Sequence, residues 1–349
     1  AIANDLNGKT ILTTGSAGSI GSEMVRQIAK FTPRCLVLID QAETPQHDIR
    51  LMMAEKWPDI ECHTIVTSIC NQKNMERIFA ENHPEYVFHA AAYKHVPMME
   101  DNPSESIRNN VIGTKILADL AVKYGTAKFV MISTDKAVNP TNVMGCSKRI
   151  CEIYVQSLDK ALKDGKVQGV TQFVTTRFGN VLGSNGSVIP LFREQIKKGG
   201  PVTVTHPDII RFFMLIPEAC RLVLEAGVKG NGGEIFVFDM GDPVKISDLA
   251  KRMIKLSGAK DIEIKYTGLR PGEKLYEEVL STEETTLPSF HDKIRIAKVR
   301  EYDYDNINRI ISDMGKKCDI LPDLDIVKMM KDVVPEYISK NSVYELLDQ

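Results

Sequence analysis

The sequence lacks the cysteine patterns that hold a metal ion or a disulfide framework. Its seven cysteines are scattered, and no two of them form a C-x-x-C pair. An odd number of thiols at such spacings indicates neither a disulfide-stapled domain nor a zinc centre. We therefore expect no metal site, and a reducing compartment such as the cytoplasm.

Long hydrophobic runs and an excess of one charge are also absent. No window of about 18 uninterrupted apolar residues occurs, so the sequence predicts no helix that spans a bilayer. The 44 Lys and Arg residues nearly balance the 46 Asp and Glu residues, which gives a net charge of −2. A protein whose main task is to bind nucleic acid usually has an excess of positive charge instead. We expect a small-molecule partner and no nucleic acid.

What is present is enough chain for a large α/β unit. The 349 residues are 43% hydrophobic and exceed the usual domain size of roughly 100 to 200 residues. Short apolar runs alternate with amphipathic stretches, which predicts a Rossmann-like, doubly wound parallel sheet with helices on both faces. The predicted strands cover residues 9–14, 36–39, 62–66, 86–88, 129–132 and 171–177, and the predicted helices cover residues 22–31, 71–82, 104–124 and 147–163.

The rhythm of the pattern changes after the sixth predicted strand, where Gly and Pro clusters appear. We expect residues 1–178 to form one domain and residues 179–290 to form a smaller mixed α/β lobe. Within that lobe, residues 234–245 should return to the sheet. Residues 291–349 form a polar tail with helices near residues 306 and 324–332.

The first predicted turn has the composition of a dinucleotide site. Glycines let the backbone approach a pyrophosphate, whose charge the N-terminus of the following helix stabilises. The second strand ends in Asp40, nineteen residues beyond Gly21. A carboxylate there accepts hydrogen bonds from ribose hydroxyls and repels a 2′-phosphate, which favours NAD over NADP. The residues of the turn that we assign to the cofactor are Gly15, Gly18, Ser19, Ile20 and Gly21.

The fifth predicted strand ends in a group of reactive side chains at the carboxyl edge of the sheet, where doubly wound folds bind ligands. Met144 and Lys148 are four residues apart and share one face of the next helix. Oxidation of an alcohol needs a base, and a thioether cannot be one. Asp135 and Lys136 are therefore the candidate acid and base. The alternative is a plain salt bridge in a loop, which is how most adjacent opposite charges behave.

The acid–base roles set requirements for two pKa values. Lys136 needs a lowered pKa, from burial and from the cations Lys148 and nicotinamide, whereas desolvation must raise the pKa of Asp135. A diphosphate needs cationic donors, and three arginines in Gly/Pro-punctuated segments could supply them. The alternative is that these are surface arginines near turns. The three are Arg177, Arg211 and Arg270.

Several strings resemble one family. The G-x-x-G-x-x-G spacing resembles the extended short-chain dehydrogenases/reductases. The string S-T-D-K-A-V-N-P-T-N-V-M-G resembles the nucleotide-sugar 4,6-dehydratases of bacterial polysaccharide biosynthesis. The resemblance covers residues 9–280 and includes H-A-A-A-Y-K-H-V-P-M-M-E and L-R-P-G-E-K-L-Y-E-E. Most short-chain dehydrogenases carry Tyr where this chain has Met144. A Met at this position resembles the pattern of the configuration-retaining UDP-N-acetylglucosamine 4,6-dehydratases, whereas relatives that invert C5 usually keep Tyr there.

The resemblance implies a role for each matching residue. Thr134 would bind the sugar C4 oxygen, Asp135 would be the acid, Lys136 the base, and Lys148 would fix the cofactor ribose. Lys94 would edge the sugar pocket. Ser68 stands where such proteins often carry an Asp that holds the adenine. The remaining implied contacts are Ala90 and Ala91 beside the cofactor, Asn180, Arg211 and Arg270 on the diphosphate, and Glu273 on the uridine ribose.

The implied reaction is NAD-dependent 4,6-dehydration of UDP-N-acetylglucosamine with C5 configuration retained. A C5-inverting dehydratase, a UDP-sugar epimerase and a non-catalytic NAD-binding module remain alternatives. Residues 104–124 and 147–163 resemble helices with which this superfamily builds dimers through a four-helix bundle, so we expect a homodimer or a higher oligomer. Such dehydratases often follow an amino-terminal membrane region, so we expect a membrane anchor outside this chain and a cytoplasmic catalytic part.

Overall fold

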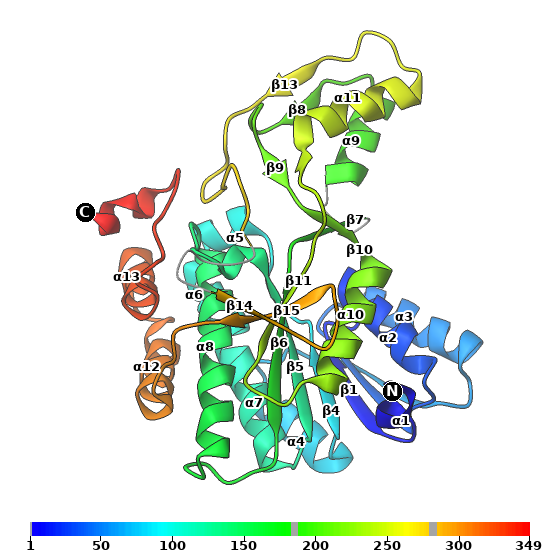
Figure 1. Ribbon diagram of the computed structural model, residues 1–349, viewed down its shortest axis with the longest axis vertical. Helices are drawn as coiled ribbons and strands as arrows, with labels where there is room; N and C mark the ends of the chain where they lie inside the picture. The colour runs from blue at the N-terminus through cyan, green and yellow to red at the C-terminus, as the bar shows by residue number, and fades with distance from the viewer. Residues whose placement is uncertain (1, 183–187, 279–284) are drawn as a thin grey trace.

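A nine-stranded sheet forms the centre of the protein (Figure 1). The computed structural model describes residues 2–182, 188–278 and 285–349. The strand order is β14-β15-β11-β6-β5-β4-β1-β2-β3, and all neighbours from β11 to β3 pair in parallel. The Rossmann-like α/β fold is therefore confirmed. The strands are β1 (Thr10–Thr14), β2 (Cys35–Asp40), β3 (Glu61–Val66), β4 (Tyr86–His89), β5 (Lys128–Thr134), β6 (Gln172–Phe178), β11 (Ile235–Phe238), β14 (Thr285–Pro288) and β15 (Ile294–Lys298).

Helices cover both faces of this sheet, because successive side chains of each buried strand point to opposite sides. Leu12 of β1 belongs to one hydrophobic core and Ile11 to the other. One face carries α4 (Gln72–Asn82), α7 (Gly113–Lys123) and α8 (Val143–Lys163), and the other carries α2 (Ser19–Ala29), α3 (Glu43–Lys56) and α10 (Ile216–Lys229). The pattern did not predict α3, which buries only Gln46, Ile49 and Met53 and so has a weak apolar stripe.

A smaller lobe stands above the carboxyl ends of the central strands (Figure 1). Two short parallel strands, β8 (Val202–Val204) and β13 (Ile264–Tyr266), pack with α9 (Val188–Lys197) and α11 (Ile246–Ser257) around a separate core that contains Phe192. The lobe joins the sheet through β7 (Asn180–Leu182), β9 (Ile210–Arg211), β10 (Phe213–Leu215) and β12 (Val244–Lys245). Between these pieces the chain returns to the large sheet as α10 and β11.

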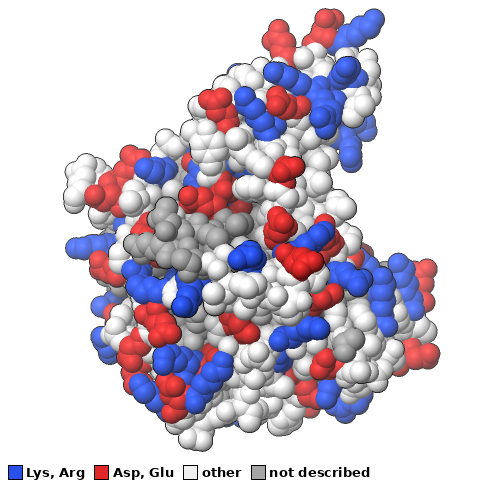
Figure 2. Space-filling model, viewed as in Figure 1, with Lys and Arg blue, Asp and Glu red and all other residues white. Residues whose placement is uncertain are grey.

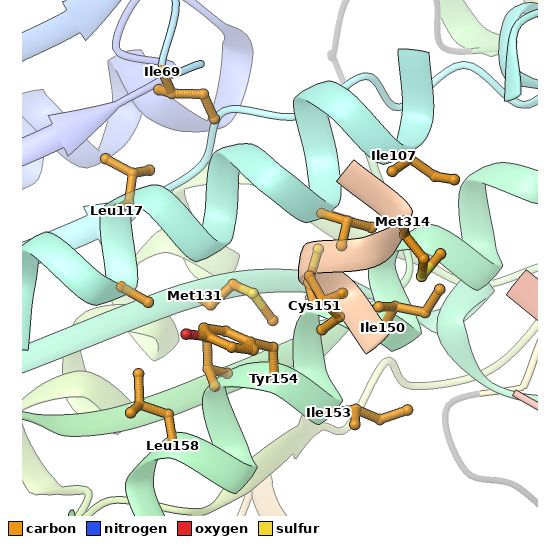
Figure 3. Close-up of a cluster of buried hydrophobic side chains, with 14 of the residues drawn as sticks. Ile69, Ile107, Leu117, Met131, Ile150, Cys151, Ile153, Tyr154, Leu158 and Met314 are labelled. Carbon is orange, nitrogen blue, oxygen red and sulfur yellow. The ribbon is translucent and has the colours of Figure 1, made fainter. Parts of the chain in front are cut away.

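The C-terminal helices α12 (Tyr304–Lys317) and α13 (Asp323–Val333) pack along α8 (Figure 1). Met314 of α12 enters the same core as Ile150 and Cys151 of α8 (Figure 3). The chain's own tail thus covers α8, which the sequence analysis assigned to a four-helix dimer bundle. The expected homodimer stays a prediction. The sequence did not reveal this intrachain packing, because the tail's apolar residues are too far along the chain for a local pattern to pair them with α8.

The helix predicted at residues 104–124 is divided. It comprises α6 (Pro103–Glu105), a π-helical segment η1 (Ser106–Ile112) and α7. Among the described residues no helix is long and apolar enough to cross a membrane. On the face in Figure 2, basic and acidic side chains are interspersed over both the large unit and the small lobe.

Candidate active site

Two cavities open at the carboxyl ends of the parallel strands. The first is bounded by the glycine turn after β1 and by the ends of β2, β3 and β4. The second, of about 540 Å³, lies between the sheet edge and the small lobe. Ile20, Ala90, Ala92 and Lys94 line both cavities, so the two spaces adjoin. This is the edge at which doubly wound sheets bind ligands.

The glycine turn is held so closely that side chains would not fit. Gly15 has φ +66°, and a Cβ atom there would lie 2.8 Å from the Ala91 nitrogen. A Cβ at Gly21 would overlap the carbonyl oxygen of Gly15. Both positions therefore require glycine. Every turn residue assigned to the cofactor lines the first cavity, namely Gly15, Gly18, Ser19, Ile20 and Gly21, as do Asp40, Ala90 and Ala91.

Asp40 ends β2 and fixes the turn as well as facing the cavity. Its Oδ2 atom accepts a hydrogen bond from the Ala17 nitrogen at 3.0 Å, and its Oδ1 atom accepts one from the Ala42 nitrogen at 2.9 Å. Ser68 lines the same cavity, and its hydroxyl accepts from the Cys70 nitrogen. Sequence reasoning assigned no role to five further lining residues, which are Ile39, Gln41, Thr67, Ile69 and Asn109.

The end of β5 places Thr134 and Lys136 in the wall of the second cavity. Asp135 lies between them in a 3₁₀ turn and is fully buried. Its Oδ1 atom accepts a hydrogen bond from the Thr134 hydroxyl at 3.2 Å and lies 3.5 Å from Lys136 Nζ. Its Oδ2 atom has no hydrogen-bond partner among the described residues. Asp135 is absent from the cavity wall that the described residues form, whereas its two contacts, Thr134 and Lys136, belong to that wall.

Burial raises the pKa of Asp135, and the nearby carboxylate of Glu277 adds to this effect, against the opposing Lys136. That direction was predicted and is confirmed. The expected low pKa of Lys136 was wrong. Burial lowers the pKa of this amine, but Asp135 and Glu277 outweigh burial, so the pKa lies above its usual range. Asp135 makes the larger of the two charge contributions and was known from the sequence, whereas Glu277 comes from a distant segment that no local pattern places beside Lys136.

Met144 and Lys148 lie one turn apart at the start of α8, and both line the second cavity. Asn142 caps this helix by accepting a hydrogen bond from the Gly145 nitrogen at 2.7 Å. Burial lowers the pKa of Lys148. A Cβ at Gly145 would overlap the carbonyl oxygen of Lys136, so close packing fixes the start of α8 against the 3₁₀ turn. The i, i+4 spacing predicted this shared face.

The small lobe contributes cations to the second cavity. Arg211 of β9 is buried, and its Nη2 atom lies 3.4 Å from a Glu273 oxygen. The Arg270 side chain is 62% exposed and lies 3.6 Å from the same carboxylate. Asn180 accepts a hydrogen bond from Lys136 Nζ at 3.1 Å. All four residues line the cavity, together with Lys94.

Arg177 does not join this group, which corrects the expectation from the sequence. Its side chain is fully buried, and its guanidinium donates to Glu152 of α8 at 2.6 Å. Arg177 is absent from the described cavity wall. Because strand side chains alternate, Arg177 points into the sheet–helix interface, whereas Phe178, the next residue, lines the cavity. Of the three expected arginines, Arg211 and Arg270 therefore line the cavity.

Glu277 is the functional candidate that sequence reasoning missed. Its buried side chain lines the second cavity, 4.0 Å from Lys136 Nζ and 3.8 Å from Arg211 Nε. The available signal was the L-Y-E-E string that follows L-R-P-G-E-K. Two consecutive glutamates after a nucleotide-site motif give a pattern search no means of choosing between them.

One group of side chains elsewhere has the chemistry of metal ligands. The ligand atoms of Cys35, Glu61 and His63 lie within 4.8 Å of one another at the start of β2 and β3. These residues line neither cavity. Burial raises the pKa of the Cys35 thiol to about 12, which opposes the thiolate form that binds metals. This group has no part in the site above.

The fold, the glycine turn with Asp40, and the Thr134–Lys136 and Met144–Lys148 arrangement at the sheet edge define an α/β protein of the short-chain dehydrogenase/reductase type. More narrowly, the chain belongs to the polysaccharide biosynthesis protein family, whose model matches residues 11–299.

Similar proteins agree with this assignment. The chain is 50% identical over 316 residues to the capsular polysaccharide biosynthesis protein CapD of Staphylococcus aureus, which covers 90% of this chain and 52% of CapD. It thus spans about half the length of that relative. It is 37% identical over 280 residues to a UDP-glucose 4-epimerase of Rickettsia akari, which covers 79% of each chain. The X-ray structure of Pen from Bacillus thuringiensis superposes with a TM-score of 0.76 at 30% identity, which covers 88% of this chain and 99% of Pen.

Proposed function

We propose that the chain binds NAD in the first cavity and a UDP-sugar in the second, and that it catalyses 4,6-dehydration of UDP-N-acetylglucosamine with C5 configuration retained. The observation that carries this proposal is that the candidate reactive residues and two arginines line the same cavity. Lys136, Met144 and Lys148 line the second cavity together with Arg211 and Arg270. The match to the polysaccharide biosynthesis family supports a role in making sugar nucleotides for such polymers.

The residues of the first cavity fit a dinucleotide. A Cβ at Gly15 or Gly21 would clash with the backbone of Ala91 or of Gly15, so glycine keeps the tight turn over which a pyrophosphate would lie. Asp40 lines the cavity where a ribose would sit. Lys148 would hold the nicotinamide ribose from the second cavity. Bound there, NAD would supply the hydride acceptor for the sugar C4 atom and, once reduced, the hydride donor for C6.

The chain's own residues handle the protons. The Thr134 hydroxyl is hydrogen-bonded to Asp135, so it can relay the C4 hydroxyl proton to the buried carboxylate, and the raised pKa of Asp135 helps it to hold that proton until water leaves. Once C4 is a ketone, the C5 proton is acidified. The Lys136 amine, after giving up its own proton, removes the C5 proton, and it returns a proton to C5 when C6 receives the hydride. The proton held by Asp135 then leaves with the C6 hydroxyl as water.

Dehydration is tested by mass and by stereochemistry. Pure protein is incubated with NAD and UDP-N-acetylglucosamine, and we expect a product lighter by one water. Proton NMR of a reaction in deuterated water then shows whether C5 keeps its configuration. Asp135→Asn should abolish turnover while nucleotide binding is kept. Turnover of this variant at the wild-type rate would remove Asp135 from the mechanism.

An epimerase is the second candidate, because the relative from Rickettsia akari bears that name. An epimerase would yield a sugar nucleotide of unchanged mass, so the same incubation separates the two reactions. Binding of NAD and UDP without any product would instead indicate a non-catalytic module. We further propose that residues 1–178 and 179–290 act as the cofactor and substrate parts, with residues 291–349 bracing α8.

A further inference from the structure

One carboxyl group in the second cavity has no part in the chemistry described above. The Glu277 side chain is 4% exposed, and its Oε1 atom lies 4.0 Å from Lys136 Nζ and 3.8 Å from Arg211 Nε. Its Oε2 atom is buried and has no hydrogen-bond partner among the described residues. A native structure rarely leaves a buried carboxyl oxygen unpaired without a functional reason. We therefore regard Glu277 as a functional part of this site.

Hydrogen bonds on both sides hold the segment that carries Glu277. From β9, Arg211 donates to the carbonyl oxygens of Lys274 at 2.7 Å and of Leu275 at 3.2 Å. From the other side, Lys274 Nζ donates to the carbonyl oxygen of Val138 at 2.6 Å, directly after the turn that holds Lys136. The backbone thus brings the Glu277 carboxyl to Lys136, and its place does not depend on the ion pairs alone.

The charges that act on Lys136 come from several segments. Asp135 on its own turn lies 3.5 Å away and Glu277 lies 4.0 Å away. The cations that oppose them are Arg211 from β9, Lys274 from the same segment as Glu277, and Lys94 from the residues after β4. Asn180 contributes a neutral acceptor at 3.1 Å. Among the described residues, Asp135 and Glu277 favour the ammonium form through their charge, and of these two it is Glu277 that lines the cavity.

We propose that Glu277 is a positioning residue of the acid–base group, which with Asp135 holds the Lys136 amine between two carboxylates at the wall of the sugar cavity. It acts by attraction across 4.0 Å and does not transfer a proton to the sugar. The effect is to make Lys136 a stronger base that gives up its own proton at higher pH. The proposal rests on the proposed function only in treating Lys136 as the base.

The test measures the titration of Lys136 directly. The protein is labelled with trace acetic anhydride across a pH series, and the acetylation of each lysine is followed by peptide mass spectrometry, with solvent-exposed lysines as internal standards. Lys136 lines the cavity and is 20% exposed, so the reagent can reach it. In Glu277→Gln we expect its titration midpoint to fall by about 1 to 3 pH units, the usual effect of losing an opposite charge at 4 to 6 Å.

Glu278→Gln is the matched control. Glu278 is the next residue, but its side chain is 44% exposed and pairs with Lys274 at 3.9 Å, so the Lys136 midpoint should stay at the wild-type value. If Glu277→Gln fails to fold, as judged by circular dichroism, Glu277→Asp keeps the charge on a shorter arm and should show part of the fall. A midpoint unchanged in both folded Glu277 variants overturns the proposal.

The pH profile of turnover separates this proposal from the proposed function. If Lys136 is the base, the acidic limb of the wild-type profile should move to lower pH in Glu277→Gln by the same amount as the labelling midpoint. If the wild-type protein dehydrates the sugar but Glu277→Gln changes neither the labelling midpoint nor the pH profile, the proposed role of Glu277 is contradicted and the proposed dehydration is not. A shifted midpoint in a protein that forms no dehydrated product supports the role of Glu277 and overturns the dehydratase.

Discussion

Replacing Arg177 with methionine should unfold the protein more readily and leave nucleotide binding intact. Arg177 and Glu152 are both fully buried, and they share two hydrogen bonds, at 2.6 Å and 3.2 Å. Methionine keeps much of the length and apolar volume of the arginine stem. The substitution thus removes the charge and its hydrogen bonds and opens little space in the core.

The magnitude follows from what remains around Glu152. Breaking a buried ion pair by removing one partner costs about 3 to 5 kcal/mol, because the other charge is left without compensation. In Arg177→Met, Glu152 still accepts hydrogen bonds from Ser133 at 2.7 Å and Arg149 at 3.2 Å. We therefore expect a loss near the lower end of that range, about 3 kcal/mol of unfolding free energy.

Urea unfolding followed by circular dichroism measures the loss, and calorimetric titration with UDP measures binding. Arg270→Met is the matched control, because the Arg270 guanidinium is 62% exposed and lines the second cavity. It should weaken UDP binding and change the unfolding free energy by less than about 0.5 kcal/mol. If Arg177→Met proved as stable as wild type but bound UDP poorly, Arg177 would belong to the nucleotide site and our reasoning would be refuted.

The remaining predictions concern the pH dependence of that pair, the cofactor turn and the C-terminal helices. Burial raises the pKa of Glu152, but Arg177 and the other donors around Glu152 outweigh burial and hold this pKa below 4.5. The stabilising contribution of the Glu152 carboxylate is therefore present above pH 4.5 and is lost as the pH falls through the lowered pKa of the folded state. In urea titrations, the difference in unfolding free energy between wild type and Glu152→Gln should narrow over that fall in pH. Gly21→Ala should abolish NAD binding in calorimetry, since its Cβ would overlap Gly15. Asp40→Ala should weaken NAD binding and narrow the preference over NADP, measured as a ratio of dissociation constants. Ile311→Ala, in the core between α12 and α8, should cost about 2 to 5 kcal/mol in urea unfolding.

Local sequence was sufficient for the parts of the site that one turn or one helix face positions. The glycine turn and Asp40 lie beside one cavity because a strand, a turn and the next strand of a parallel sheet bring them there. Met144 and Lys148 share a cavity because a helix repeats every 3.6 residues. In each case the residues involved are close in sequence or follow the fixed order of a doubly wound sheet.

Tertiary contacts decided what no local pattern encodes. Arg177 and Arg270 look alike in sequence, yet one is buried against Glu152 and the other is exposed at the cavity, because the side of the strand and the helix packed against it determine where a side chain ends. Glu277 reaches Lys136 although the two residues are 141 positions apart in the sequence, and it adds to the effect of Asp135 in raising the pKa of that amine. The tail covers α8 for the same reason. Sequence therefore determined the elements and their local chemistry, whereas long-range packing determined the charges around the amine.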